Sequence, residues 1–392
     1  MKWEQVALGD VCEVIAGQSP KSSNYNNAKN GLPFYQGKKE FTSKYLGAPT
    51  KWTTHVTSEA IAGDILMSVR APVGPINFAT ERICIGRGLA AIRAAEQIEP
   101  NFLFYLLLSM QDQINGSEGA VFASINKNQI QCISFCKPPL AEQKRIVAVL
   151  DEAFAAIATA TENTKKNLAN AQELFDSELN RVFKSPDEYS VSDVAAHTVK
   201  IMDVVEPLTT TDPRKQPEES FEYIDVSSVS RITHSIRTTS PTLGCDAPSR
   251  AKRLVRAGDV LFATIRPTLQ RIAIVPAHLD QAICSTGYFV LRPKPDVNSR
   301  FLFYYLFSQP FSDEMALLQR GASYPAVSDR DVKEHLIHLP PLPEQNRIAT
   351  FLDKLSAEKQ TLVETYKTKI RSLVELKQSL LHQAFIGELT SK

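Results

Sequence analysis

The chain has 392 residues, more than one hydrophobic core usually serves, so two to four structural units are expected. Its hydrophobic content of 43% and charged content of 22% are ordinary for a globular protein, and the absence of any apolar run of about 18 residues argues against a membrane span. The net charge of +1 excludes a protein that coats nucleic acid by overall charge, so any DNA-binding surface must come from local clusters of basic residues.

The six cysteines show no CxxC pairing, and the N-terminal sequence lacks the apolar core of a signal peptide. Both features predict a cytoplasmic protein with reduced, mostly buried thiols. Cys132 and Cys136 are four residues apart, but no second Cys/His pair completes a zinc site. We therefore expect no metal.

Residues 1–137 alternate short apolar runs with Gly, Pro, Asn and Ser turns, a pattern typical of a mixed α/β domain. AGDILMSV predicts a turn leading into a buried strand, and NFLFYLLLSMQDQI predicts a helix. Residues 138–184 then begin with two prolines, which are tolerated at a helix start but not inside a helix. Apolar residues recur there at alternating spacings of four and three, so a long heptad helix is expected over 140–184.

Residues 185–339 repeat the pattern of the first domain. AGDVLFATIR corresponds to AGDILMSVR, ICSTGYFVLR to ICIGRGLAAIR, and RFLFYYLFS to NFLFYLLLS. The final segment, 340–392, opens with PPLPEQNRIATFLDK, which corresponds to PPLAEQKRIVAVLDE at 138 with an offset of 202 residues. Self-similarity at so long a period indicates two tandem domains of one kind, each followed by the same helix.

The predicted seam of the second helix runs through Leu352, Leu355, Lys359, Leu362, Tyr366, Lys369, Leu373, Leu376 and Leu380. A helix of about 45 residues spans roughly 65 Å and cannot bury such a seam on a small domain alone, so the two helices must pack together. Polar seam residues such as Thr164 and Glu178 would set the register or face partner proteins. We predict an α+β protein: two similar mixed α/β domains joined by two long antiparallel coiled-coil helices, with pseudo-two-fold symmetry.

These motifs give the chain a family resemblance: it resembles the specificity subunit of type I restriction-modification systems. The resemblance rests on W-x-x-V-x-L-G-D-V at the start, on GDIL and GDVL inside the domains, and on PPLAEQKRI and PPLPEQNRI before the helices. It implies two target-recognition domains that each read half of a bipartite DNA site, and helices that act as spacer and docking surface. It implies as partners double-stranded DNA, two modification subunits and restriction subunits, with S-adenosylmethionine, ATP and Mg²⁺ used by the partners, and no catalytic site on this chain.

A direct search for enzyme motifs agrees with that expectation. An adenine methyltransferase would need an NPPY-like loop to hold the flipped base, but no Asn or Asp precedes either proline pair, and both pairs lead into helices. GLPFYQGKK has the wrong spacing for a phosphate loop, and Lys39 replaces the hydroxyl residue that would bind magnesium. His335 and His338 lack a supporting carboxylate arrangement. The alternative to a DNA-recognition subunit is an adaptor that carries two domains for protein or sugar on a helical rod.

We expect DNA contacts from two kinds of loop in each domain. The first follows the GDIL or GDVL strand and carries Arg70, Arg266 and Arg271; arginine suits bidentate reading of guanine or binding of phosphate. The second lies before the last strand and carries small, hydroxyl, aromatic and basic groups: Gly119, Phe122, Ser124, Lys127, Gly321, Ser323, Tyr324 and Ser328. The alternatives are a salt-bridging or turn-stabilising arginine and a framework turn. Further phosphate contacts are expected from Lys38, Lys39, Arg250, Lys252 and Arg253.

Partner contacts are expected where the repeat is most faithful, at Glu142, Gln143, Arg145, Glu344, Gln345 and Arg347. Charge at a helix N-terminus explains a glutamate, but a helix cap does not require all three residue types together. Two equivalent elements would recruit two copies of one partner. Because the loops of the two domains differ in length and composition, the half-sites should differ and should be separated by a gap that the helical spacer fixes.

Overall fold

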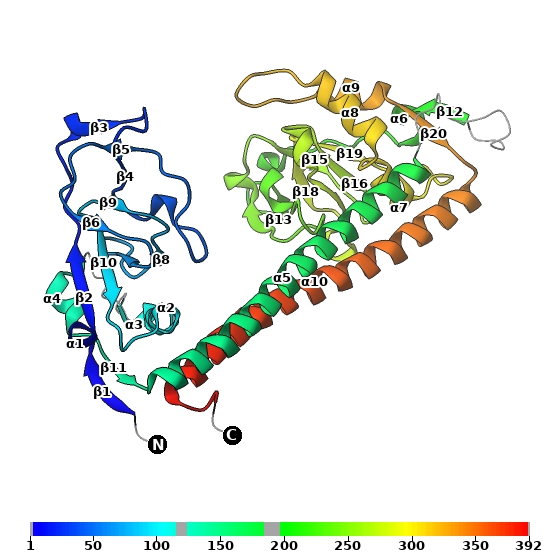
Figure 1. Cartoon of the computed structure of the whole chain (residues 1–392). Helices are drawn as coiled ribbons and strands as arrows, with labels where there is room; N and C mark the ends of the chain where they lie inside the picture. Colours follow the sequence, from blue (N-terminus) through cyan, green and yellow to red (C-terminus); the bar gives the residue numbers. More distant parts are fainter. Residues whose placement is uncertain (1–2, 115–123, 184–196, 391–392) are drawn as a thin grey trace. The chain divides into compact units, whose positions relative to one another are not determined.

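The computed structural model describes residues 3–114, 124–183 and 197–390. The chain divides into two compact units: unit 1 comprises 1–165 and 367–392, and unit 2 comprises 166–366. Each unit therefore contains one mixed α/β domain and parts of both long helices, α5 (Leu140–Val182) and α10 (Leu342–Ile386) (Figure 1). The two predicted long helices are confirmed.

The described residues of unit 1 form three sheets. The central antiparallel sheet has the order β2-β10-β7-β8, with bounds Cys12–Ala16, Leu89–Ala94, Ile65–Ser68 and Ile76–Phe78. A second sheet has the order β3-β5-β4-β9-β6, with bounds Tyr25–Asn26, Trp52–Thr53, Leu32–Tyr35, Ile83–Ile85 and Glu59–Ala60. The terminal pair is β1 (Glu4–Ala7) with β11 (Ser134–Lys137). The shorter helices are α1 (Leu8–Val11), α2 (Pro100–Ser109), α3 (Gln111–Ile114) and α4 (Lys127–Gln131).

Unit 2 follows the same plan. Its central sheet has the order β17-β16-β19, with bounds Ile272–Ile274, Val260–Ala263 and Tyr288–Leu291. The second sheet has the order β14-β13-β18-β15, with bounds Ser240–Leu243, Ser220–Ile224, Ile283–Ser285 and Ala251–Leu254. The terminal pair is β12 (His197–Lys200) with β20 (Leu336–Leu339). The shorter helices are α6 (Ile201–Val204), α7 (Ser299–Tyr305), α8 (Gln309–Leu318) and α9 (Asp329–Glu334).

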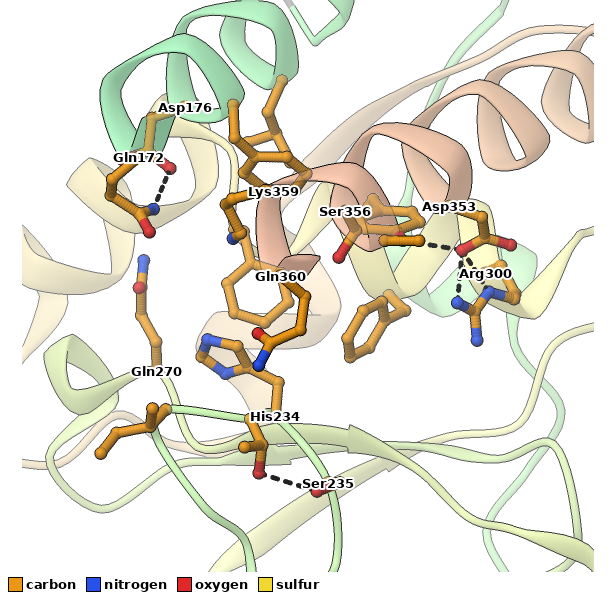
Figure 2. A pocket seen from close by; sticks show the side chains of 18 of the residues that line it. Gln172, Asp176, His234, Ser235, Gln270, Arg300, Asp353, Ser356, Lys359 and Gln360 are labelled. Atoms are coloured by element: carbon orange, nitrogen blue, oxygen red, sulfur yellow. Dashed lines mark hydrogen bonds and ion pairs between the residues drawn. The ribbon is translucent and has the colours of Figure 1, made fainter. Parts of the chain in front are cut away.

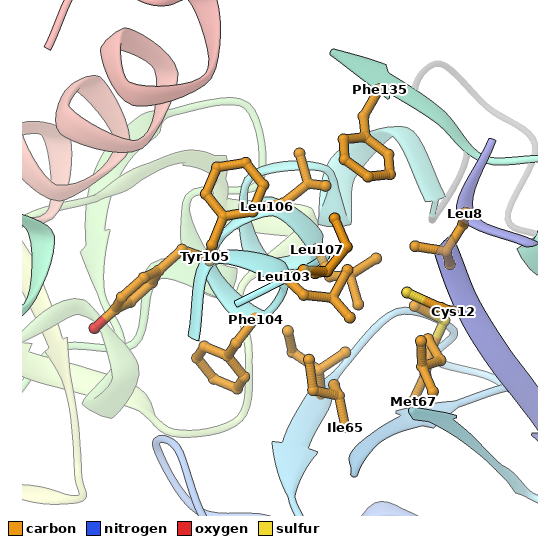
Figure 3. Close-up of a cluster of buried hydrophobic side chains, with 14 of the residues drawn as sticks. Leu8, Cys12, Ile65, Met67, Leu103, Phe104, Tyr105, Leu106, Leu107 and Phe135 are labelled. Carbon is orange, nitrogen blue, oxygen red and sulfur yellow. The ribbon is translucent and has the colours of Figure 1, made fainter. Parts of the chain in front are cut away.

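The core of unit 1 forms where α2 packs against the central sheet. Leu103, Phe104, Tyr105, Leu106 and Leu107 on α2 are all nearly inaccessible, and they belong to one apolar cluster with strand and terminal residues (Figure 3): Leu8, Cys12, Ile65, Met67 and Phe135. The aromatic residues of NFLFYLLLS predict core packing, and the burial of Phe102, Phe104 and Tyr105 confirms it. The segments NFLFYLLLSMQDQI and RFLFYYLFSQPFSDEM each predict one helix, and both predictions are wrong. The first segment is divided into α2 and α3 at Met110. The second is divided into α7 and α8, because Ser308 is the N-cap of α8 and Pro310 occupies its first turn.

A buried ion pair explains why the Gly-Asp motif recurs with a distant arginine. In unit 2 the carboxylate of Asp259 accepts two hydrogen bonds from Arg292 at 3.0 and 2.7 Å, and it also accepts the N–H of Arg256 at 2.8 Å. In unit 1 Asp64 and Arg93 form the equivalent bidentate pair at 2.9 and 2.8 Å. The motif thus closes the turn before the central strand and ties it to the neighbouring strand.

The long helices pack antiparallel within each unit. In unit 1 the start of α5 and the end of α10 share one apolar cluster, which includes Leu150, Phe154, Leu380 and Leu381. In unit 2 the end of α5 and the start of α10 share another, and Lys359 of α10 lies over the ring of Phe175 of α5. The apolar spacing predicts a seam on α5, and every position of it is buried or half-buried: Leu150, Phe154, Ile157, Thr161, Thr164, Leu168, Ala171, Phe175, Glu178 and Val182. On α10 three predicted seam residues are instead exposed: Leu362, Lys369 and Leu376. Val363 and Ile370 are half-buried in their place. The reason is that the seam residue after Lys359 follows at a spacing of four residues, where the prediction had three.

The expectation of mostly buried thiols is half right: Cys12, Cys84 and Cys284 are buried, whereas Cys132, Cys136 and Cys245 are exposed. Burial raises the pKa of Cys12 to about 12, so this thiol behaves as an apolar core group. Within the described ranges, no helix is long and apolar enough to cross a membrane.

Candidate nucleic-acid interface

The two loops that were predicted to contact DNA meet in unit 1. The N–H of Val69, at the end of β7, donates to Gly88 O at 3.0 Å, and Val69 O accepts the N–H of Ile125 at 3.0 Å. Arg70 and Ser124 form a β-bridge beside these bonds. On the other side Gly88 N–H donates to Gln36 O at 3.2 Å. We call the segments 36–39, 69–70, 86–88 and 124–125 the loop cluster of unit 1.

Unit 2 builds the same arrangement with different residues. Thr264 N–H donates to Gly287 O at 2.9 Å, and Thr264 O accepts the N–H of Val327 at 2.9 Å. Ile265 and Ala326 form the β-bridge that corresponds to Arg70 and Ser124. The loop cluster of unit 2 comprises 225–229, 264–266, 285–287 and 323–327.

A glycine is required at the centre of each cluster. A Cβ on Gly88 would lie 2.4 Å from Gln36 O, and a Cβ on Gly287 would lie 2.5 Å from Val226 Cγ2. Only a residue without a side chain allows the turn to approach the neighbouring loop so closely. The clusters are therefore rigid at their base, which suits a surface that must present side chains in fixed positions.

The correspondence predicted between Arg70 and Arg266 is off by one residue. The bonded pairs make Val69 equivalent to Thr264, so Arg70 corresponds to Ile265, and Arg266 lies one position further along. A shift of one residue along an extended segment turns a side chain to the opposite face. Arg266 moreover has a left-handed backbone conformation (φ 51°), which changes the direction of its side chain further. The two units thus present arginine differently on one scaffold.

Arg266, Ser323 and Tyr324 come together in unit 2. The guanidinium of Arg266 lies over the ring of Tyr324, 5.0 Å from the ring centroid, and Nη2 approaches Ser323 O at 3.4 Å. The backbone N–H of Arg266 donates to Pro325 O at 2.7 Å. Tyr324 is 72% exposed, so this cation–π pair stands on the surface, accessible to a ligand.

Other predicted contacts are distributed unevenly. In unit 1 four predicted contact residues are exposed. Lys38 and Lys39 follow the bonded Gln36, Ser124 belongs to the 124–125 segment, and Lys127 lies two residues after it. Phe122 and Gly119 lie outside the described residues. In unit 2, Arg250 is exposed beside the cluster, where its carbonyl accepts the N–H of Thr286 at 2.8 Å.

Three further basic residues of unit 2 have structural partners or partial burial. Nη1 of Arg271 donates to Val229 O at 2.6 Å and approaches two neighbouring carbonyls at 3.4 Å, so this arginine stabilises the 226–229 turn. Arg253, whose side chain is 11% exposed, forms an ion pair with Asp329 at 2.7 Å. Lys252 is half-buried. Direct DNA contacts by these three residues remain predictions.

The repeated helix start has two distinct parts. Gln143 and Gln345 are each 1% exposed, and each amide joins the helix to its own domain. Gln345 Oε1 accepts the N–H of Asn298 at 2.8 Å, and its Nε2 donates to Pro340 O at 2.8 Å and to Asp296 O at 3.2 Å. Burial leaves these two glutamines no surface for a partner, so the structure explains their repetition by the fold itself.

The glutamates and arginines of the repeat lie on the helix surface. Arg347 donates two hydrogen bonds to Glu344, at 2.8 and 2.6 Å, and these lower the pKa of the glutamate; Arg145 is 3.6 Å from Glu142. One turn after each arginine stands an exposed apolar residue, Val149 (37%) or Phe351 (41%), again at the repeat offset of 202. We call these residues the duplicated helix patch: 142, 145 and 149, with 344, 347 and 351.

Unit 2 also contains a hollow of about 820 Å³ where its domain faces both helices (Figure 2). Lys359 lies 3.9 Å above the ring of Phe175, and burial lowers the pKa of this lysine. His234 is half-buried at the hollow, and burial lowers its pKa as well.

No group of three or more His, Cys, Asp or Glu residues suited to a metal occurs in the part of the chain that the structure describes. His335 is instead a buried hydrogen-bonding residue, 2.7 Å from both Tyr305 and Glu314.

One exposed basic residue of the unit 1 cluster was not predicted. Arg87 lies at the turn between β9 and β10, and its N–H donates to Ser19 Oγ at 3.1 Å. Two flanking glycines are the sequence signal that could have revealed it, since GRG indicates a backbone packed tightly on both sides of one charged side chain. Its counterpart in unit 2 is Thr286.

Comparison with known proteins identifies the class. The model of the type I restriction modification DNA specificity domain matches residues 1–170 and 197–372. The chain therefore belongs to this family of DNA specificity proteins, as the repeated motifs indicated. The match does not support the alternative of a non-DNA adaptor.

Individual relatives agree. The chain is 22% identical to the Escherichia coli EcoDI type I restriction enzyme specificity subunit over 421 residues, which cover 100% of this chain and 89% of that protein. A second relative comes from Methanocaldococcus jannaschii and bears the name of the specificity subunit of the type I restriction enzyme MjaX. It is 44% identical to this chain over 148 residues, which cover 37% of this chain and 35% of that protein. A solved HsdS subunit from Thermoanaerobacter tengcongensis has the same fold, with a TM-score of 0.67, 22% identity and coverage of 99% and 97%.

Proposed function

We propose that this chain is the DNA-reading subunit of a type I restriction-modification complex, and that each unit reads one half of a bipartite, asymmetric site. One observation carries the proposal: both units build the same loop cluster on the same hydrogen bonds, but present different side chains from it. Unit 1 exposes Arg70 and Ser124, whereas unit 2 exposes Arg266 stacked on Tyr324. A constant scaffold with different surface groups suits two readers of different sequences.

The guanidinium group of Arg266 is the principal candidate for a base contact. Arginine pairs with the O6 and N7 atoms of guanine through two parallel hydrogen bonds, and a good pair contributes about 1–3 kcal/mol of discrimination. Stacking on Tyr324 orients the guanidinium of Arg266 before DNA arrives, which reduces the entropy that binding would cost. Lys38, Lys39, Lys127 and Arg250 are exposed lysine or arginine side chains suited to phosphate contacts, which position the duplex without selecting sequence.

Chemistry is proposed to reside on partner subunits, which would use S-adenosylmethionine, ATP and Mg²⁺. The duplicated helix patch is the proposed docking surface for two modification subunits, and restriction subunits complete the complex. Each copy of the patch combines a half-buried glutamate, paired with an exposed arginine, and an exposed apolar residue one turn away. An apolar residue beside a hydrogen-bonding rim is a common composition for a specific interface.

Methylation mapping tests the proposal. DNA from cells that express this chain with its modification subunit should carry methyl groups at one motif with two unlike halves and a fixed gap. A contiguous or palindromic motif would contradict the two-reader model. Absence of any motif, with the complex shown to be assembled, would contradict the assignment as a DNA-reading subunit.

A further inference from the structure

Arg87 occupies a turn that is held from three sides. Leu89 N–H donates to Gly86 O at 2.9 Å and closes the turn, and Gly88 N–H donates to Gln36 O on the neighbouring loop. A Cβ on Gly86 would lie 2.9 Å from Gln36 Cα, so the loop also packs directly on this glycine. The backbone of Arg87 is therefore fixed, while its side chain is exposed.

Arg87 and Arg70 flank the same bonded pair. The ladder of β7 and β10 pairs Ser68 with Leu89, and it continues one step further through the bond from Val69 N–H to Gly88 O. Arg70 follows Val69, and Arg87 precedes Gly88. Their Cα atoms are therefore at most about 13 Å apart, a span that two arginine side chains bridge easily.

The two guanidinium groups have no acidic partner in the part of unit 1 that the structure describes: neither side chain forms an ion pair or hydrogen bond there. Lys38 and Lys39 lie close by, two and three residues after the bonded Gln36. Like charges gathered in this way repel one another, and they destabilise the folded chain unless an anion neutralises them. Other exposed arginines of this domain are paired, as Arg82 is with Glu59 at 2.6 Å.

We propose that Arg87 and Arg70 together hold one backbone phosphate of the DNA in the half-site that unit 1 reads. This inference rests on the proposed function. Phosphate fits the arrangement better than a base edge does, because several acceptor oxygens can be shared between two guanidinium groups, whereas a guanine edge occupies one. Unit 2 has Ile265 and Thr286 at the equivalent positions, so it lacks this phosphate site and contacts the DNA of its half-site through other residues.

The test uses the complex of the full chain with its modification subunit and a duplex that carries the methylated motif. The affinity for this duplex is measured between about 50 and 200 mM salt for wild type and for Arg87→Ala. Loss of one phosphate contact should weaken binding about tenfold and reduce the slope of log K against log salt by about 1, with the methylated motif unchanged. Arg87→Lys should keep the wild-type slope, because it retains the charge. Arg82→Ala, the matched control with an ion-paired arginine, should change neither quantity.

Thr286→Arg provides a reciprocal measurement, since a charge added beside the unit 2 cluster should steepen the slope. An unchanged slope in Arg87→Ala, with wild-type thermal stability, would overturn the phosphate site. A methylated motif relaxed at one base would also overturn it, since Arg87 would then read a base. If the wild-type complex itself shows no preference for the mapped duplex over a scrambled one, the proposed function fails, independently of Arg87.

Discussion

The side-chain amide of Gln143 accepts the backbone N–H of Glu99 at 2.8 Å, and Gln345 makes the same bond to Asn298. Glu99 and Asn298 are the N-caps of α2 and α7, so each glutamine joins the start of a long helix to the start of a core helix. The nitrogen of Gln143 donates to Pro138 O at 2.9 Å and to Gln97 O at 3.1 Å. One glutamine thus satisfies three backbone groups at a junction that contains two prolines.

Replacement of either glutamine by leucine should destabilise the protein. The leucine fits the volume but leaves buried backbone groups unpaired, at about 1–3 kcal/mol for each group. Chemical denaturation of Gln143→Leu and Gln345→Leu measures the loss, and Lys144→Ala, an exposed neighbour, is the control. Wild-type stability in both leucine variants would show that these hydrogen bonds do not hold the junction.

The two buried ion pairs should differ in cost when broken. Asp259→Ala leaves Arg292 buried without its partner, since the arginine side chain is 7% exposed, and we expect a loss of about 3–5 kcal/mol. Asp64→Ala should cost less, because Arg93 is 34% exposed and keeps a contact with Glu13 at 3.3 Å. Urea unfolding of both variants gives the comparison. Equal losses would mean that solvent exposure of the arginine does not set the cost.

Arg266→Ala should weaken binding through one half-site only. With a duplex whose unit 2 half-site is intact, the loss should be about tenfold or more; with that half-site scrambled, the variant and wild type should bind alike. Tyr324→Ala should give a smaller effect in the same direction, because it removes the stacking that orients the guanidinium. Arg320→Ala is the control, since Arg320 stands nearby but pairs with Asp331 at 3.3 Å. An equal loss on both duplexes would contradict the assignment.

Acidification should destabilise the protein through His335. Burial lowers the pKa of this histidine in the folded state below its ordinary value of 6.5, so the unfolded chain takes up the proton first. The free energy of unfolding should therefore fall as the pH decreases below about 6.5. His234, whose pKa burial also lowers, acts in the same direction. Unfolding curves at several pH values should show a shallower dependence for His335→Gln, and an unchanged dependence would exclude His335 as a source.

Simultaneous replacement of Arg145 and Arg347 by alanine should reduce the number of modification subunits bound. Each arginine belongs to one copy of the duplicated helix patch, and its loss removes the rim beside Val149 or Phe351. Native mass measurement of the complex gives the stoichiometry, with single variants expected to lose one copy at most. Full assembly by the double variant would reject this docking surface.

The sequence by itself determined the two similar domains, both long helices and one buried strand after the Gly-Asp turn of each domain. These features depend on local patterns: apolar spacing, prolines before a helix, and a Gly-Asp turn before a strand. The PPL-x-EQ-x-RI repeat opens both long helices, but burial divides its residues into two groups. Only the folded chain shows that Gln143 and Gln345 point inward while the arginines remain exposed.

Tertiary structure alone decided the remaining relationships. The motif match paired Arg70 with Arg266 although AGDILMSVR is one residue shorter than AGDVLFATIR, and the hydrogen bonds of Val69 and Thr264 align Arg70 with Ile265. The phase change on α10 after Lys359 and the meeting of Arg87 with Arg70 were likewise not evident in the sequence. The physical reason is common to all three: strand register and helix phase are set by contacts between distant segments, and one residue of slip moves a side chain to another face without changing the local pattern.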